Sequence, residues 1–112
     1  MQLSTRSITS LLAATKRYAR QSQELSGRQL RKIERLLRCH DRKGVLRADI
    51  LGMDPLTYRH EQRRLPLEEL VKKHGFKDII SFLQAVYGKL RHELHLRGWS
   101  ARKLRQFETA RA

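Results

Sequence analysis

The chain has 112 residues, of which 39% are hydrophobic and 32% are charged, with a formal net charge of +14 and a pI near 11.1. This length suits one domain and the apolar content suits a folded chain, which excludes a disordered or a two-domain protein. So large a positive charge predicts a polyanionic partner: nucleic acid first, an anionic membrane surface second and an acidic protein third.

The cysteine content and the length of the apolar runs limit the cellular compartments that we expect for the protein. The single cysteine, Cys39, excludes an internal disulfide and fits a reducing environment. No apolar run approaches the roughly 18–20 residues that a membrane-spanning helix needs. We therefore expect an intracellular protein, either cytoplasmic or associated with the nucleoid or nucleus. Mitochondrial import is the alternative, because the first segment is rich in Arg and Ser and has no acidic residue before Glu24.

The first segment, Ser4–Gln23, has the pattern of an amphipathic helix. Its apolar side is made of Ile8, Leu11, Leu12, Thr15, Tyr18 and Ala19. Arg17 and Arg20 fall on the opposite side of this helix. The pattern predicts that one face joins the core and the other is cationic.

The stretch Ser26–Gly44 divides into two stripes when it is drawn as a helix. The i, i+3, i+4, i+7 spacing of a buried face is followed by Leu30, Ile33, Leu36, Leu37 and His40. The same spacing on the opposite side is followed by six cations, which we call the cationic ridge: Arg28, Arg31, Lys32, Arg35, Arg38 and Arg42. The ridge would be roughly 21 Å long. Ser26 is expected at the N-cap and Gly44 at the C′ position.

Like charges at this spacing destabilise an isolated helix by a few tenths of a kcal/mol per pair, so the ridge predicts an anionic ligand. The alternative is that the ridge is a solvated face that serves solubility.

The middle of the chain is nearly neutral. Residues 44–76 hold 6 Lys/Arg against 5 Asp/Glu, whereas residues 1–43 hold 11 against 3 and residues 77–112 hold 8 against 3. Gly44–Met53 is short and apolar, and it predicts either one or two helical turns or a short strand at Val45–Leu46.

Two further helices are expected before residue 76. Asp54 followed by Pro55 predicts a helix start, and this helix should run to about Arg64. A second helix should begin at Pro66 and end at Gly75, with acidic residues in its first turn and basic residues in its last.

The longest periodic run, Lys77–Arg97, predicts a core helix. Its buried stripe is expected to be Ile79, Ile80, Leu83, Val86, Tyr87, Leu90 and Leu94, with Phe82 and Leu96 at the edges. After Gly98, Ala101–Arg111 predicts a last helix with Leu104 and Phe107 facing inward. Its basic character comes from Arg102, Lys103, Arg105 and Arg111.

Together these elements predict an all-α or nearly all-α protein, a compact bundle of five to seven helices. We expect a single basic domain over residues 1–112. Its central part, about 28–97, would resemble a helix-turn-helix or winged helix, and basic helices at 4–23 and 100–111 would flank it.

The residue pattern does not suggest catalysis, so we expect a non-enzymatic protein without a metal or another cofactor. The 5 histidines and Cys39 lack zinc-finger spacing. Cys39 and His40 are adjacent, and adjacent helical side chains point about 100° apart, so they cannot pair as nucleophile and base. No glycine-rich loop is present that would cradle a phosphate.

The segment Leu65–Leu83 combines a helix, a glycine turn and a following apolar residue, as a helix-turn-helix does. However, Ser81 and Gln84 stand where the bacterial type has apolar residues. This segment is therefore a weak candidate for reading DNA bases.

A set of short motifs between Lys32 and Val86 follows another pattern: an apolar helix before Gly44, Val45-Leu46, Tyr58, Leu65-Pro66, Gly75-Phe76, Asp78-Ile79-Ile80 and Phe82-Leu83. In these motifs the stretch resembles the LOTUS (OST-HTH) domain, a winged-helix-like module of RNA-regulating proteins. The chain departs from that family in its β-wing, because Gln84–Arg97 continues as helix. The resemblance implies binding of RNA or docking on a DEAD-box RNA helicase.

The leading hypothesis is a nucleic-acid-binding domain that contacts the phosphate backbone through the cationic ridge. The footprint would extend to Arg17 and Arg20 and to Arg102, Lys103 and Arg105. RNA is favoured over DNA because of the LOTUS resemblance. The alternative is an adaptor or inhibitor that docks on a protein through the near-neutral segment 55–76, while the basic flanks steer association.

Overall fold

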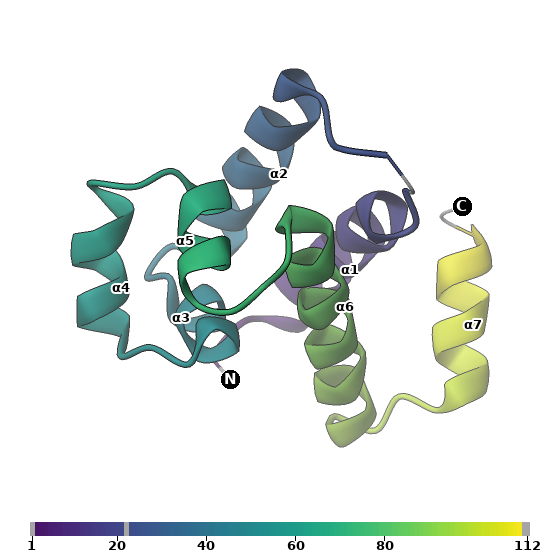
Figure 1. Ribbon diagram of the computed structural model, residues 1–112. Coiled ribbons are helices and arrows are strands. Elements are labelled where there is room, and N and C mark those ends of the chain that lie inside the picture. Colours follow the sequence, from purple (N-terminus) through teal and green to yellow (C-terminus); the bar gives the residue numbers. More distant parts are fainter. Residues whose placement is uncertain (1, 22, 111–112) are drawn as a thin grey trace.

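The computed structural model describes residues 2–21 and 23–110. Within these ranges the chain folds into seven helices and forms no strand, which confirms the prediction of an all-α protein (Figure 1). Ser22 and Arg111, which belong to the predicted flanking segments, lie outside the described residues. The helices are α1 (Thr5–Ala19), α2 (Gly27–His40), α3 (Val45–Leu51), α4 (Pro55–Gln62), α5 (Leu67–Lys73), α6 (Ile79–Leu96) and α7 (Ala101–Ala110).

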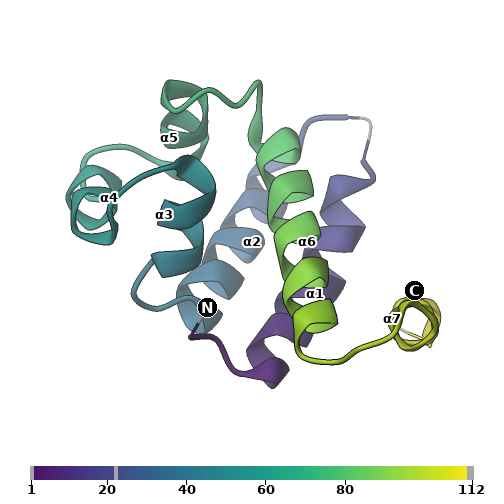
Figure 2. The same ribbon diagram turned by 90° about the horizontal axis from the view of Figure 1, so that it is seen from below.

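Helices α1 and α6 form the centre of the molecule and run in opposite directions (Figure 2). The start of α6 meets the end of α1, where Gln84 Nε2 donates to the Ala19 carbonyl oxygen at 3.2 Å. At the other end, Arg97 Nη1 donates to Thr5 Oγ1 at 3.1 Å. Ile8, Leu11 and Leu12 of α1 are fully buried, as the periodicity predicts.

Helix α2 packs on α1 and begins with a capping box. The Gln29 N–H donates to Ser26 Oγ at 3.2 Å, and the Ser26 N–H donates to Gln29 Oε1 at 2.9 Å. Ser26 is therefore the N-cap of α2, as the sequence predicts. Ile33 and Leu37 are fully buried, which turns the opposite side of α2 to solvent.

The predicted role of Gly44 is wrong. Helix α2 ends at His40 with Asp41 as its C-cap, and Gly44 is the N-cap of α3. Its φ of +69° is left-handed, a conformation that glycine adopts without strain. The alternative of a strand at Val45–Leu46 is also wrong, because this segment forms the first turn of α3.

A buried ion pair determines the turn between α2 and α3. Asp41 and Arg47 are 2% and 5% exposed, and Arg47 Nε donates to Asp41 Oδ2 at 3.0 Å. The same carboxylate accepts hydrogen bonds from the N–H groups of Leu46 and Arg47, both at 3.1 Å. Arg47 also donates from Nη2 to the Asp41 carbonyl oxygen. Asp41 thus caps the N-terminus of α3 and neutralises a buried guanidinium at the same time.

The predicted stripe of α6 needs two corrections. Phe82, expected at the edge, is fully buried and meets the Phe76 ring edge-on at a centroid distance of 5.7 Å. Leu96, expected at the other edge, is 65% exposed. Phe82 is central because α6 is covered by α1, α3 and α5, which together bury a wider arc than one neighbour would. Ile80 and Tyr87 are only partly buried.

Helix α7 lies at the edge of the molecule, and α1 and α6 stand between it and α2 (Figures 1 and 2). Leu104 is its buried residue and Phe107 packs on Trp99. Glu108 holds α7 to the centre: Tyr87 Oη donates to its Oε1 at 2.7 Å, and Lys16 and Arg91 form ion pairs with it. Burial and this hydrogen bond raise the pKa of Tyr87 above its usual value.

Replacing Asp41 with Ala should leave the buried Arg47 guanidinium without its counter-ion and α3 without its cap. We expect the free energy of unfolding to fall by about 3–5 kcal/mol. The measurement is urea denaturation followed by circular dichroism. Asp49→Ala is the matched control, since it breaks the exposed Asp49–Lys89 pair and should cost under about 1 kcal/mol. Equal losses in the two variants would contradict the structural role of Asp41.

Gly44→Ala and Gly52→Ala form a second matched pair, because both glycines have φ near +70°. A Cβ at position 44 would lie 2.9 Å from Tyr58 Cδ1, whereas none of the described atoms lies within 4 Å of one at position 52. Both changes carry the left-handed penalty of about 1–2 kcal/mol. Gly44→Ala should lose about 1–3 kcal/mol more, because the Tyr58 ring has to shift. Thermal and urea denaturation of both variants would measure the difference, and identical stabilities would contradict the close packing of Tyr58 on Gly44.

Candidate nucleic-acid interface

The cationic ridge lies on the solvent side of α2. Its six members are all exposed: Arg28, Arg31, Lys32, Arg35, Arg38 and Arg42. Five of them are helical, and Arg42 lies in the turn that follows. The helical part, from Arg28 to Arg38, is therefore about 15 Å long, shorter than the predicted ridge.

The cations of α1 share a groove with the ridge. A groove of about 650 Å³ runs between α1 and α2, and its cationic lining includes Arg17, Arg20 and Lys32. Small side chains of α1, Ser10, Ala13 and Ala14, line the same groove, so a ligand can approach the helix closely. The structure thus brings Arg17 and Arg20 beside the ridge.

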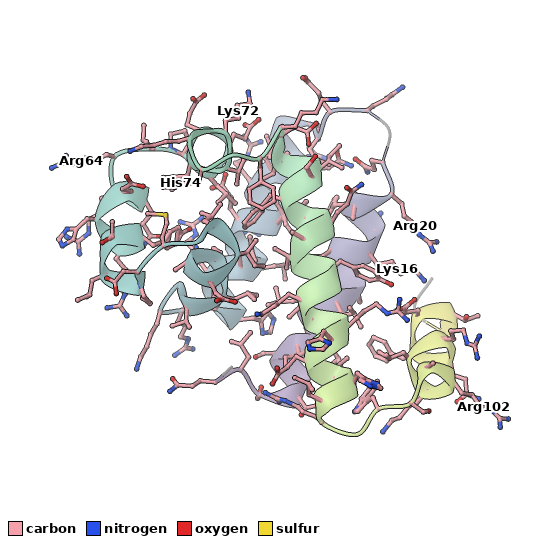
Figure 3. The ribbon with its side chains drawn as sticks, turned by 60° about the horizontal axis from the view of Figure 1, so that its bottom comes forward. Lys16, Arg20, Arg64, Lys72, His74 and Arg102 are labelled. Carbon is pink, nitrogen blue, oxygen red and sulfur yellow. The ribbon has the colours of Figure 1, made fainter. Side chains whose placement is uncertain are left out.

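The cations of α7 belong to a different surface. Arg102, Lys103 and Arg105 are exposed, but α1 and α6 separate them from α2. In Figure 3, Arg102 extends from the side of α7 that faces away from α6. Lys103 Nζ lies 4.2 Å from the centre of the Trp99 ring. The structure therefore does not join these cations to the ridge.

Five acidic residues of the described structure form ion pairs. Among the described residues, the ion pairs of Asp41, Asp49, Glu61, Glu93 and Glu108 all use cations that are not in the ridge. Lys16 is an example, because it reaches from α1 toward α7 and pairs with Glu108 at 3.5 Å (Figure 3). The positive charge of the ridge is thus not compensated by an ion pair within the described part of the chain.

At the C-terminal end of the ridge lies a pocket of about 510 Å³ that the sequence pattern did not predict, and we call it the α2–α4 pocket. Arg38 and Arg42 line one side and Arg63, from the end of α4, lines the other. Arg47 and Tyr58 also line it, and both are buried. Periodicity alone could not find the pocket, because it places residues on faces of their own helix and not opposite residues of another.

Cys39 and His40 do not pair as a nucleophile and its base. Cys39 is exposed, and His40 Nδ1 is 3.1 Å from Ser7 Oγ. His40 is therefore a partly buried, hydrogen-bonded histidine. Within residues 2–21 and 23–110, no group of three or more His, Cys, Asp or Glu side chains is arranged to hold a metal ion.

No family model, curated protein or solved structure matches this chain. None of the helices in the described ranges combines the length and the apolar character that a membrane crossing requires.

Glu61 joins α4 to α5 and so positions the Arg63 side of the α2–α4 pocket. It accepts hydrogen bonds from Lys73 Nζ at 2.6 Å and from His74 Nε2 at 2.9 Å. The hydrogen bond from Lys73, followed by that from His74, holds the pKa of the Glu61 carboxyl below its usual value.

This lowered pKa predicts a pH-dependent stability. A carboxyl whose folded pKa is depressed stabilises the fold above its unfolded pKa, and the contribution is lost as pH falls through the folded pKa. We expect Glu61→Gln to be less stable than the unchanged protein at pH 7 and the difference to shrink steadily as the pH falls below the usual glutamate pKa of about 4.3. Urea denaturation between pH 7 and pH 3 measures it. Glu24→Gln, which removes an exposed carboxylate without an ion pair in the described structure, should show no such trend.

Proposed function

We propose that this chain is a non-enzymatic nucleic-acid-binding protein and that the cationic ridge lies along the phosphate backbone of a double helix. The observation that carries the proposal is the exposure of five cations along one side of α2, with Arg42 in the turn that follows, and none of the six forms an ion pair in the described structure. Arg17 and Arg20 extend the contact across the α1–α2 groove.

The repulsion between the cations of the ridge supports the proposal of an anionic ligand. Neighbouring like charges at i, i+3 and i, i+4 destabilise a helix by about 0.2–0.5 kcal/mol per pair. Glu34 is the acidic residue of α2, and no ion pair joins it to the cations beside it in the described structure. A polyanion removes this repulsion, and its condensed counter-ions are released when the ridge replaces them.

The length of the ridge fits a phosphate backbone. Each strand of a duplex presents one phosphate per 3.4 Å of helix axis but winds around that axis, so about 15 Å of straight ridge can reach roughly two or three successive phosphates. Most of the cations are arginines, whose planar guanidinium groups bind phosphate through two hydrogen bonds. The spacing and the residue type therefore support backbone contacts more than base reading.

The placement of the aromatic rings argues against binding of single strands by base stacking. Tyr18, Tyr58 and Phe82 are buried, and the other rings, Phe76, Tyr87, Trp99 and Phe107, are partly buried. Stacking platforms need exposed ring faces. The proposal is accordingly one of double-helix recognition, and RNA is favoured over DNA on the LOTUS resemblance of Lys32–Val86.

The alternative role, docking on a protein through segment 55–76, has less support. This segment forms α4 and α5, and Leu56 is its one large apolar side chain that is strongly exposed, at 63%. A single exposed leucine is ordinary on a protein surface and does not make a docking patch.

The test compares two double variants that remove the same charge. Arg31→Gln/Arg35→Gln lies on the ridge, whereas Arg102→Gln/Arg105→Gln lies on α7, beyond α1 and α6. On a duplex, the ridge variant should reduce the slope of log K against log salt by one to two, at about 0.9 per lost phosphate contact. The α7 variant should reduce it by less than one. The measurement is fluorescence anisotropy at several salt concentrations.

Circular dichroism of both double variants serves as the folding control. Equal effects of the two changes would contradict the proposal, because the binding would then follow net charge and not the ridge. Unchanged affinity and slope in the ridge variant would contradict it as well.

A further inference from the structure

The α2–α4 pocket has a mixed lining that a bare phosphate backbone does not require. Its volume, about 510 Å³, lies within the range of small-molecule sites. The rim carries three arginines from three segments: Arg38 of α2, Arg42 of the following turn and Arg63 at the end of α4. All three are exposed, and none forms an ion pair in the described structure. The rim therefore attracts an anion.

The floor of the pocket is rigid. Arg47 is held by the Asp41 carboxylate, and its guanidinium carbon lies 5.3 Å from the centre of the Tyr58 ring. Tyr58 is 1% exposed and packs on Gly44. Because Asp41 neutralises Arg47, the positive charge available to a ligand comes from the rim.

The wall opposite α2 is apolar. It is formed by Leu65, Pro66 and Leu67, where the chain turns from α4 into α5. A pocket with a cationic rim and an apolar wall suits a ligand with an anionic end and a flat, weakly polar end. A nucleotide has both: its phosphate matches the arginines and its base matches the wall.

Glu34 gives the pocket a preference among bases. It is a partly buried acid beside Arg38 and lines the same pocket, yet it forms no ion pair in the described structure. A carboxylate accepts hydrogen bonds from an exocyclic amino group, such as N4 of cytosine, and repels the carbonyl oxygen that uracil has at that position. Gln62, whose amide can donate and accept, lines the pocket as well.

We propose that the α2–α4 pocket holds one unpaired nucleotide of the bound nucleic acid. Arg38, Arg42 and Arg63 bind its phosphate, its base lies against Leu65 and Pro66, and Glu34 selects a base with an amino group. This inference rests on the proposed function, because the pocket continues the ridge at its C-terminal end: Arg38 and Arg42 belong to both. The ridge then binds the double helix, and the pocket selects a helix with an extruded nucleotide.

The test uses three RNA duplexes that are identical except at one site: fully paired, with a single bulged cytidine, and with a single bulged uridine. The full-length protein should bind the cytidine bulge about tenfold more tightly than the paired duplex, and the uridine bulge less tightly than the cytidine bulge. Fluorescence anisotropy at one fixed salt concentration measures all three.

Two single variants assign the preference to the pocket. Arg63→Gln should abolish most of the tenfold preference while it changes the affinity for the paired duplex less than threefold, since Arg63 is not in the ridge. Glu34→Gln should bring the cytidine and uridine bulges to similar affinities. Thermal denaturation checks that both variants fold.

The outcomes separate the two proposals. Equal binding of paired and bulged duplexes, or a bulge preference that survives Arg63→Gln, would overturn the pocket inference and leave the ridge untouched. Absence of binding to every duplex would overturn the proposed function. Displacement of the bulged duplex by a phosphotyrosine peptide at concentrations where cytidine monophosphate has no effect would assign the pocket to a phosphopeptide and overturn the nucleotide inference.

Discussion

The buried pair of Asp41 and Arg47 connects the core to the cationic surface. Burying two charges costs several kcal/mol per ion, and the pair offsets this only because its polar groups are well bonded. The carboxylate accepts two backbone N–H groups and Arg47 Nε, while the guanidinium also reaches the Asp41 carbonyl oxygen. The geometry of these bonds holds the end of α2 at the start of α3. It therefore determines where Arg38 and Arg42 lie relative to α4.

Helix α2 carries both core residues and the cationic ridge. The stabilisation from its buried side chains exceeds the repulsion between its cations. Repulsion summed over the neighbouring cations of the helix amounts to about 1–2.5 kcal/mol. Full burial of Ile33 and Leu37 returns about 1.5–3 kcal/mol for each side chain. The capping box of Ser26 and Gln29 adds to this at the N-terminus. The fold can therefore keep an uncompensated row of arginines, provided that these two core positions remain apolar.

Sequence periodicity could predict what depends on one helix at a time. Six of the seven helical segments, the N-caps Ser26 and Asp54 and the outward side of the ridge follow from local patterns, whereas the pattern left α3 open between helical turns and a strand. What it could not predict depends on contacts between helices. Phe82 is central because three helices surround α6, and Leu96 is exposed although its spacing suits the edge of the stripe. The local pattern places Gly44 just after the end of α2. The structure places it at the start of α3, against the ring of Tyr58, fourteen positions later.

The two basic surfaces of the molecule differ in how their charge is compensated. The inner side of α7 carries Glu108, which pairs with Lys16 and Arg91, so the positive charge between α7 and the centre is partly neutralised. Helix α7, which carries Arg102, Lys103 and Arg105, is separated from α2 by α1 and α6. Exposed charges separated by more than about 8–10 Å are largely screened at physiological salt. The cations of α7 therefore contribute little to the binding that we propose for the ridge, whereas Arg17 and Arg20 lie in the same groove as Lys32 of the ridge. Under the proposed function, the net charge of +14 steers the protein toward a polyanion, and the cations on and beside α2 are the place where we propose that it binds.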